Sequence, residues 1–135
     1  MPALKVYAAT FISIVIIDFV WLGIVMNKFF IEQLRPIGRI VDDKFQVVLW
    51  SAVVVYIVLS IAVVEFALPK ISEGSSWLAT FGIGALLGFL LYATYDFTNY
   101  ATLKDWRIPF MIVDITWGTV LGGIITMIAR YVREM

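Results

Sequence analysis

The chain has 135 residues, of which 62% are hydrophobic and 15% charged, and its mean hydropathy is +0.97. Soluble domains are roughly 45–50% apolar and about 25% charged, and a chain this short has too little interior to hide so much apolar surface. The soluble globular and disordered classes are therefore excluded, and the zero net charge gives no electrostatic reason to expect nucleic acid as a partner. Cysteine and histidine are absent, which removes disulfides, thiolate chemistry and the commonest general base.

Four apolar runs follow one another along the chain, at about 4–26, 45–68, 77–103 and 108–129. Each reaches the roughly 20 residues that a membrane-spanning helix needs, and none alternates in polarity as a membrane strand does. Pro69 ends the second run and Pro109 lies at the start of the fourth, where a missing N–H is tolerated. We therefore predict an all-α polytopic membrane protein, with a single domain over 1–135. It should be a bundle of four transmembrane helices with both termini on the same side.

The joints between the runs indicate an orientation. The segment 27–34 mixes apolar and charged residues, so it fits either a short amphipathic turn on the membrane surface or a continuation of the first helix. Cytoplasmic loops carry an excess of Lys and Arg. The side that holds the loops after the first and third runs carries six basic residues, namely Lys28, Arg35, Arg39, Lys44, Lys104 and Arg107. The other side carries four, Lys5, Lys70, Arg130 and Arg133, so the first side is predicted to be cytoplasmic.

Three aspartates, Asp18, Asp96 and Asp114, lie inside apolar runs. A charged residue at the centre of a bilayer costs at least about 2.5–3.5 kcal/mol on insertion scales. From the rise of a helix, each of the three lies roughly 10–14 Å below the same membrane interface. We therefore expect three helices to bring an inward-facing carboxyl group to one level. Glu65 lies near the opposite end of its run and is expected to extend toward that interface.

Hydrogen-bond donors accompany these acids. The pattern Asp-x-x-Trp occurs twice, and its spacing places Trp21 and Trp117 on the helix faces of Asp18 and Asp114. The third run adds Tyr92, Tyr95 and Asn99 around Asp96. No basic residue lies at this depth, so the acids must be protonated, share protons, hold a cation or accept from such donors. We predict that Trp21 or Trp117, together with Tyr95 or Asn99, donates to one acid. Because like charges at one depth repel, at least one acid should stay protonated near neutral pH.

Glycines continue the stripes that carry two of the aspartates. Gly84 and Gly88 precede Asp96 in the third run, and Gly118 and Gly122 follow Asp114 in the fourth. Small residues at this spacing let helix backbones approach closely. We interpret them as packing positions inside the bundle, and the alternative is a dimer face.

Three of these stretches together resemble a known family. They are Asp18-x-x-Trp21-Leu22-Gly23, then Tyr95-Asp96-x-Thr98-Asn99-Tyr100 with Thr102-Leu103-Lys104-Asp105-Trp106, and Asp114-x-x-Trp117-Gly118-Thr119. The combination resembles a bacterial family of small four-helix membrane proteins of unassigned activity, catalogued as domain of unknown function 2177. The resemblance looks full-length. It implies four spans in the bacterial inner (cytoplasmic) membrane and supplies no reaction.

Three functions fit these observations. The first is a ligand-binding or transport protein whose acid and aromatic pocket, open toward one interface, holds a cation, a proton, a small solute or a lipid headgroup. The second is a membrane enzyme that acts on a lipid or other hydrophobic substrate, with a carboxyl group as general acid or base. The third is an assembly subunit of a membrane complex. The residues expected to bind ligand or carry protons are Asp18, Trp21, Tyr92, Tyr95, Asp96, Asn99, Asp114 and Trp117.

Partners and metals follow from the same residues. No metal or other cofactor is assigned, although Asp18, Asp96 and Asp114 could hold Mg²⁺ or Mn²⁺ through oxygen ligands. Membrane lipid is the expected partner. Transport by so small a chain would require a homo-oligomer, because four spans leave little interior for an alternating-access path.

Overall fold

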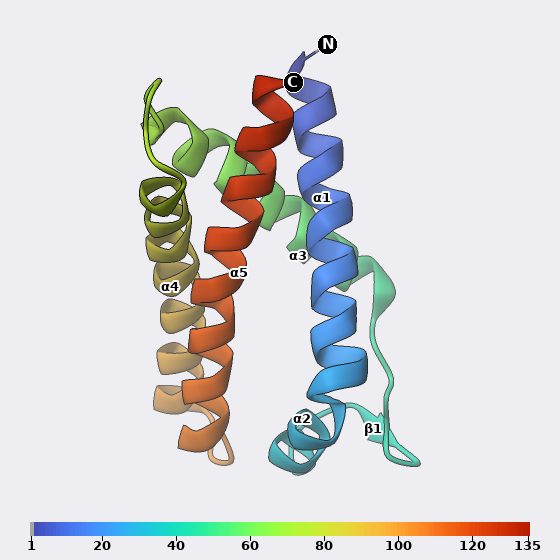
Figure 1. Cartoon of the computed structure of the whole chain (residues 1–135). Coiled ribbons are helices and arrows are strands. Elements are labelled where there is room, and N and C mark those ends of the chain that lie inside the picture. The colour runs from blue at the N-terminus through green and yellow to red at the C-terminus, as the bar shows by residue number, and fades with distance from the viewer. Residues whose placement is uncertain (1) are drawn as a thin grey trace.

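The structure is a computed structural model that describes residues 2–135, and its regular secondary structure is helical apart from one short hairpin. Four helices are long and apolar enough to span a membrane, at Ala3–Val25, Leu49–Lys70, Trp77–Thr102 and Ile108–Glu134. The predicted class, an all-α polytopic membrane protein, is thereby confirmed. Figure 1 shows both termini at the same end of the four-helix arrangement, and this end is called the termini end below.

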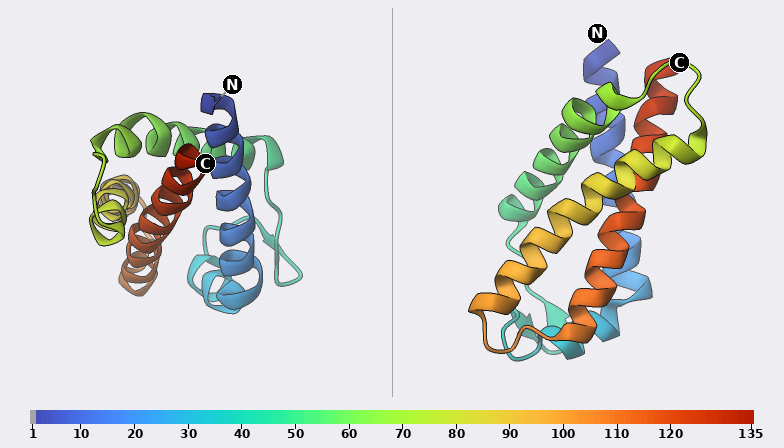
Figure 2. Two further views of the ribbon diagram at one scale, coloured as in Figure 1. Left: turned by 45° about the horizontal axis from the view of Figure 1, so that its top comes forward. Right: turned by 90° about the vertical axis from the view of Figure 1, so that its left-hand side faces the viewer.

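The first two spans each contain a π-helical turn. Helix α1 (Pro2–Val20) continues into η1 (Trp21–Val25), and α3 (Leu49–Ala62) continues into η2 (Val63–Ala67) and η3 (Leu68–Lys70). The last two spans, α4 (Trp77–Thr102) and α5 (Ile108–Glu134), are uninterrupted α-helices. Helix α3 crosses α1 and α5 obliquely, whereas α4 and α5 run side by side (Figure 1 and Figure 2).

Two boundaries differ from the sequence prediction for physical reasons. The second span begins at Leu49 rather than near 45, because Lys44 and Phe45 form a strand of the hairpin. The fourth span continues to Glu134 rather than ending near 129. Its last turns remain helical because Arg130 bonds within its own helix, to Glu134, and also to the carbonyl oxygen of Ser75 before α4.

The segment between the first two spans forms a cap at the end opposite the termini. Helix α2 (Asn27–Leu34) is a separate short helix that lies across the foot of the molecule, so it does not continue the first span (Figure 1). Strands β1 (Ile40–Val41) and β2 (Lys44–Phe45) pair antiparallel. Asp42 and Asp43 make the turn with φ angles of 49° and 57°, in the left-handed region that Asp tolerates better than most residues. This end is called the α2 end.

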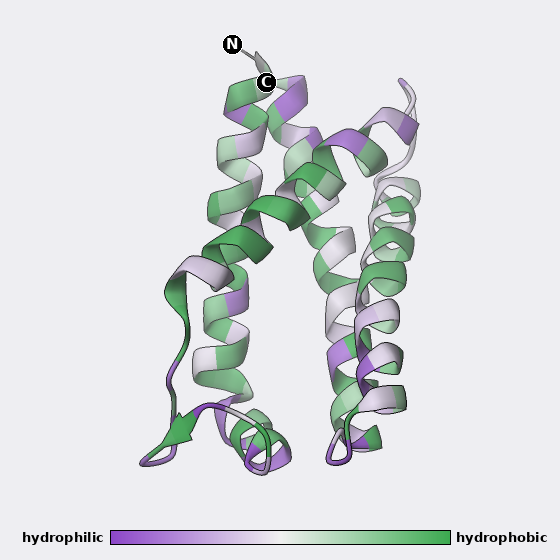
Figure 3. Ribbon diagram, turned by 180° about the vertical axis from the view of Figure 1, so that it is seen from behind, coloured by the Kyte–Doolittle hydropathy of each residue, from purple (hydrophilic) through white to green (hydrophobic). Residues whose placement is uncertain are grey.

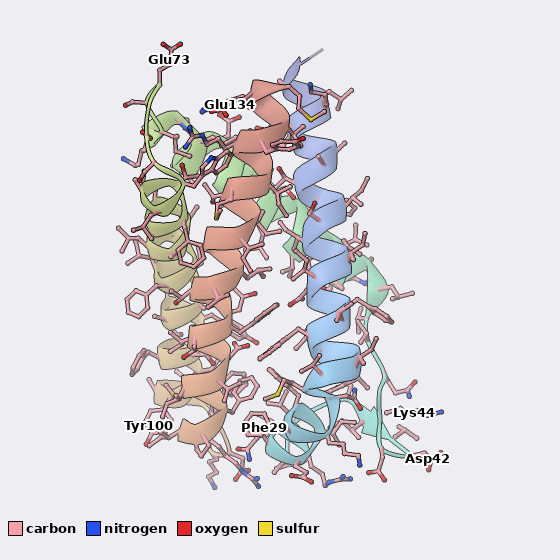
Figure 4. The ribbon with its side chains drawn as sticks, viewed as in Figure 1. Phe29, Asp42, Lys44, Glu73, Tyr100 and Glu134 are labelled. Atoms are coloured by element: carbon pink, nitrogen blue, oxygen red, sulfur yellow. The ribbon has the colours of Figure 1, made fainter. Side chains whose placement is uncertain are left out.

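Polar residues gather at the two ends, and the long helices between them are mostly apolar. Figure 3 shows this division by hydropathy, with a few hydrophilic positions inside the spans near the α2 end. Figure 4 shows the charged side chains of Asp42 and Lys44 at the hairpin, and those of Glu73 and Glu134 at the termini end. The distribution is the one that a bilayer around the middle of the molecule requires.

Helices α4 and α5 meet through their glycines. A Cβ atom added to Gly88 would lie 2.1 Å from the carbonyl oxygen of Gly118, and one added to Gly84 would lie 2.3 Å from that of Gly122. Only a residue without a side chain allows the two backbones to come this close. The four glycines therefore make a contact within one chain, and this contact occupies the faces that were the alternative dimer surface.

Two apolar clusters fill the bundle. The termini-end cluster contains Val6, Ile14, Val63, Leu68, Ile71, Leu121, Ile125 and Ala129. The α2-end cluster contains Phe30, Trp106, Phe110 and Met111. Asp114 lies between Met111 and Leu121 along α5, and Asp18 follows Ile14 along α1. The acids thus occupy a layer between the two clusters.

Candidate functional site

Asp18 joins three spans through its carboxylate. Its side chain projects from α1 and is buried, with 7% exposure. Its Oδ2 accepts a hydrogen bond of 2.8 Å from the hydroxyl group of Tyr56 in α3. Its Oδ1 accepts one of 3.0 Å from the indole N–H of Trp117 in α5. Each carboxylate oxygen therefore has one donor from a different helix.

Asp96 is the most deeply buried acid of the site, with an exposure of 0%. The indole N–H of Trp106, in the loop between α4 and α5, donates to its Oδ1 at 3.2 Å. Its Oδ2 is buried and accepts no hydrogen bond from the other side chains or backbone N–H groups of residues 2–135. The carboxyl group of Asp114, on the adjoining helix, lies within hydrogen-bonding reach of that of Asp96. Two carboxyl groups can bond in this way only when one of them carries a proton.

Two tryptophans stack beside these acids. The rings of Trp21 and Trp117 are parallel to within 4°, with their centroids 4.2 Å apart. Trp117 uses its N–H on Asp18, as the sequence predicted for one of the two tryptophans. The N–H of Trp21 is buried and has no acceptor among the described residues.

Tyr92 lies at the centre of the layer. Its ring packs directly over Gly118, where an added Cβ atom would come within 2.1 Å of the ring. Tyr92 lies one turn before Asp96 on α4, and Gly118 lies one turn after Asp114 on α5. The ring of Tyr92 therefore packs between the two helices that carry these acids.

The structure corrects the predicted role of Tyr95 and Asn99. Neither donates to an aspartate within the part of the chain that the structure describes, and Tyr95 turns outward with 57% exposure. The ring of Tyr95 instead packs edge-on against Trp106, with centroids 5.7 Å apart. Trp106 and Tyr56 are the donors in their place.

Signals for these two donors were present in the sequence. Tyr56 lies seven residues into α3, which begins at Leu49, so its depth is roughly 10 Å and equals that of the acids. An expected start near 45 hides this match. Trp106 ends the stretch Thr102-Leu103-Lys104-Asp105-Trp106. Because it follows the last turn of α4, the sequence predicts a loop position for it rather than one beside Asp96.

The acids do not form a three-ligand metal site. Within residues 2–135 no group of three acidic side chains comes together closely enough to hold a metal ion. Asp18 is held by Tyr56 and Trp117, while Asp96 and Asp114 pair with each other. The arrangement therefore contradicts the possibility, raised by the sequence, that Asp18, Asp96 and Asp114 together hold Mg²⁺ or Mn²⁺.

Among residues 2–135, no basic side chain forms an ion pair with an acid of this layer. The one basic residue that is buried in the described part of the chain is Arg130, near the termini end. Its guanidinium donates to Thr80 Oγ1 at 2.7 Å, pairs with Glu134 at 2.7 Å and lies 4.4 Å from the ring centroid of Trp77. At the same end, the hydroxyl group of Tyr7 donates to the exposed Glu65. These contacts tie helix ends together and lie apart from the acids.

Four spanning helices around a buried layer of acids and aromatic rings define a polytopic integral membrane protein. The chain belongs to the family described as Predicted membrane protein (DUF2177), whose model matches residues 3–131, and this confirms the resemblance found in the sequence. No curated protein and no solved structure matches the chain.

Proposed function

We propose that this protein carries a proton on the buried Asp96–Asp114 pair and uses the surrounding pocket to bind a small ligand, such as a cation, a proton-coupled solute or a lipid headgroup. It works in the bacterial inner membrane, with the α2 end on the cytoplasmic side. Membrane lipid surrounds it, and a homo-oligomer is the form that would transport. Intramembrane carboxyl groups are the groups that proton relays and cation sites use.

One observation carries this proposal, namely the contact between Asp96 and Asp114 without a basic partner. Two ionised carboxylates within hydrogen-bonding reach of each other would repel strongly in a low-dielectric interior. A single proton between them removes the repulsion and supplies the donor that Asp96 Oδ2 otherwise lacks. The pair therefore favours the binding of one proton. This proton is released when a cation or another hydrogen-bond donor takes its place.

The position of the layer supports exchange at one interface. On the termini side, Ile14, Leu121 and Ile125 separate the acids from the far end of the bundle. On the other side lie the smaller α2-end cluster and the interfacial helix α2. Access from the α2 end therefore crosses the thinner barrier.

A purely structural role, in which side chains only hold the helices together, does not require two adjacent carboxyl groups. Amide or hydroxyl side chains provide interhelical hydrogen bonds of about 0.6–2 kcal/mol without a charge inside the bilayer. Two adjacent carboxyl groups add a titratable proton that such a clamp does not require. The test of the proposal is therefore whether the proton is present.

Infrared titration of the metal-free protein in lipid bilayers tests the proposal. We expect a protonated carboxyl band at neutral pH that weakens in Asp96→Asn and in Asp114→Asn. Asp42→Asn, in the exposed hairpin turn, is the matched control and should leave the band unchanged. The proposal is wrong if no such band exists at neutral pH and all aspartates of the folded wild type titrate as free aspartates do.

A further inference from the structure

A pocket at the α2 end lies between the hairpin and the first turns of α3. Its volume is about 500 Å³, within the range of roughly 300–1,000 Å³ that ligand pockets have. Arg39, Gln46 and Ser51 line its polar part, and its apolar part includes Trp50 and Val55. The pocket therefore combines a positive charge and hydrogen-bond donors with an apolar wall.

Two basic side chains of the hairpin provide positive charge for this pocket. Arg39 is in the lining, and its carbonyl oxygen accepts from the backbone N–H of Gln46 at 2.7 Å, next to the strand pairs of the hairpin. This register places Lys44 on the same face as Gln46 and Arg39, because residues two apart along a strand share a face. Both cations are exposed, and neither forms an ion pair within residues 2–135, whereas Arg35 is paired with Asp43 at 2.7 Å.

The pocket crosses the membrane interface. The second span begins at Leu49, and Trp50 in its first turn is 73% exposed, at the level where tryptophan usually marks the boundary of the hydrocarbon. Val55 lies roughly 9 Å deeper along α3 than Leu49 and is 51% exposed. Arg39 and Gln46 precede the span and lie on the aqueous side of this level. An occupant that fills the pocket is therefore amphipathic, with an anionic group beside Arg39 and an apolar chain along Val55.

We infer that this pocket is a binding site for a phospholipid with a net negative charge, such as phosphatidylglycerol. Its phosphate accepts hydrogen bonds from the guanidinium group of Arg39, whose planar set of N–H donors suits phosphate oxygens. Lys44 adds a second positive charge, and one acyl chain lies along Trp50 and Val55. A zwitterionic lipid is bound less well, because none of the lining residues, all within 39–55 of the described chain, is acidic and could pair with its ammonium group.

Native mass spectrometry of the full chain in detergent tests this inference, because it counts the lipids bound to each protein. One arm titrates palmitoyl-oleoyl phosphatidylglycerol, and the other titrates phosphatidylcholine with the same chains. Arg39→Gln and Lys44→Gln each remove one charge at the pocket, and Lys104→Gln is their matched control, because it removes an exposed charge at the same end, in the loop between α4 and α5. Ala52→Phe narrows the pocket without a change of charge, and Val53→Phe makes the same kind of change on α3 outside the lining.

We expect the parent protein, Lys104→Gln and Val53→Phe to bind phosphatidylglycerol with a severalfold lower dissociation constant than phosphatidylcholine. Arg39→Gln and Lys44→Gln should each raise the dissociation constant for phosphatidylglycerol about fivefold, as the loss of one interfacial cation predicts. Ala52→Phe should weaken the binding of phosphatidylglycerol as well. Glycerol phosphate, which has the anionic group without acyl chains, should not displace the bound lipid at equal concentration.

Equal dissociation constants for the two lipids in the parent protein would overturn the inference. So would equal losses in Lys104→Gln and Arg39→Gln, because the attraction would then depend on the total charge of the α2 end. Displacement by glycerol phosphate would also overturn it, since the pocket would then take a soluble anion. Arg39 and Lys44 lie outside the acid layer, so this selectivity and the carboxyl band of Asp96 and Asp114 can each fail while the other stands.

Discussion

The indole N–H of Trp106 donates to Asp96 Oδ1 at 3.2 Å and thereby connects a loop to the most deeply buried acid of the site. The same indole ring packs edge-on against Phe110, with centroids 5.0 Å apart, and Phe110 in turn packs against Phe30 of α2 at 5.2 Å. Helix α2 is thus linked to Asp96 through the aromatic side chains of Phe30, Phe110 and Trp106.

Trp106→Phe keeps an aromatic ring in the α2-end cluster and removes the donor to Asp96. We expect a loss of about 1–3 kcal/mol in the free energy of unfolding, because both oxygens of a buried carboxyl group would then depend on Asp114. Denaturant titration in detergent micelles measures it. Trp50→Phe, at a site with 73% exposure, is the control and should change stability by less than about 0.5 kcal/mol. Equal effects of the two substitutions would contradict the assigned role of Trp106.

Tyr56→Phe removes the hydroxyl group that α3 contributes to Asp18. Interhelical hydrogen bonds in membranes contribute about 0.6–2 kcal/mol, so we expect a stability loss in that range. A double-mutant cycle with Trp117→Phe should show coupling, since both donors act on one carboxylate. Tyr100→Phe, on the exposed face of α4, is the comparison and should be neutral. Additive losses from Tyr56 and Trp117 would mean that Asp18 does not join them.

Hydropathy was enough to predict the four spans, the shared side of the termini and the class of the protein, because long apolar helices are dictated by composition. It was not enough to predict the donors. Tyr56 and Tyr95 are both tyrosines near the depth of the acids, yet Tyr56 turns inward and Tyr95 turns outward. That difference depends on how each helix is rotated against its neighbours, which no pattern within one helix determines.

The cap at the α2 end was also only partly predictable. The sequence of 27–34 fits either a short amphipathic turn or a continuation of the first helix, and in the structure it is a separate helix. The hairpin at 40–45 went unrecognised, because its turn is Asp42-Asp43 and lacks the glycine that usually marks a two-residue hairpin loop. This affects the site as well. Because Lys44 and Phe45 form a strand, α3 begins at Leu49 rather than near 45, and only this later start places Tyr56 at the depth of the acids.

Gly88→Ala tests the contact between α4 and α5. The new Cβ atom would lie 2.1 Å from the carbonyl oxygen of Gly118, so the two backbones must separate. Overpacking of this kind typically costs about 1–3 kcal/mol, measured as a loss of unfolding free energy in micelles. Gly82→Ala, on the same helix with no atom within 4 Å of the added carbon, is the matched control and should be neutral or stabilising. A neutral Gly88→Ala would show that the helices do not meet here.

The orientation in the membrane can be tested directly because the chain contains no cysteine. Glu73→Cys lies in the loop before α4, and Asp105→Cys lies in the loop between α4 and α5, at the other end. Neither change alters the count of basic residues that determines orientation. A membrane-impermeant maleimide added to intact cells should label Glu73→Cys at once and Asp105→Cys only after permeabilisation. The reverse pattern would place the α2 end outside.

The central claim is that Asp96 and Asp114 share one proton inside the bilayer, and site-resolved solid-state NMR of carbon-13-labelled aspartate tests it most directly. Spectra of the metal-free protein in bilayers at neutral pH, with Asp96→Asn and Asp114→Asn to assign the signals, report the protonation of each carboxyl group. We predict one proton for the Asp96–Asp114 pair. Signals that show both Asp96 and Asp114 ionised in the folded protein would contradict the claim.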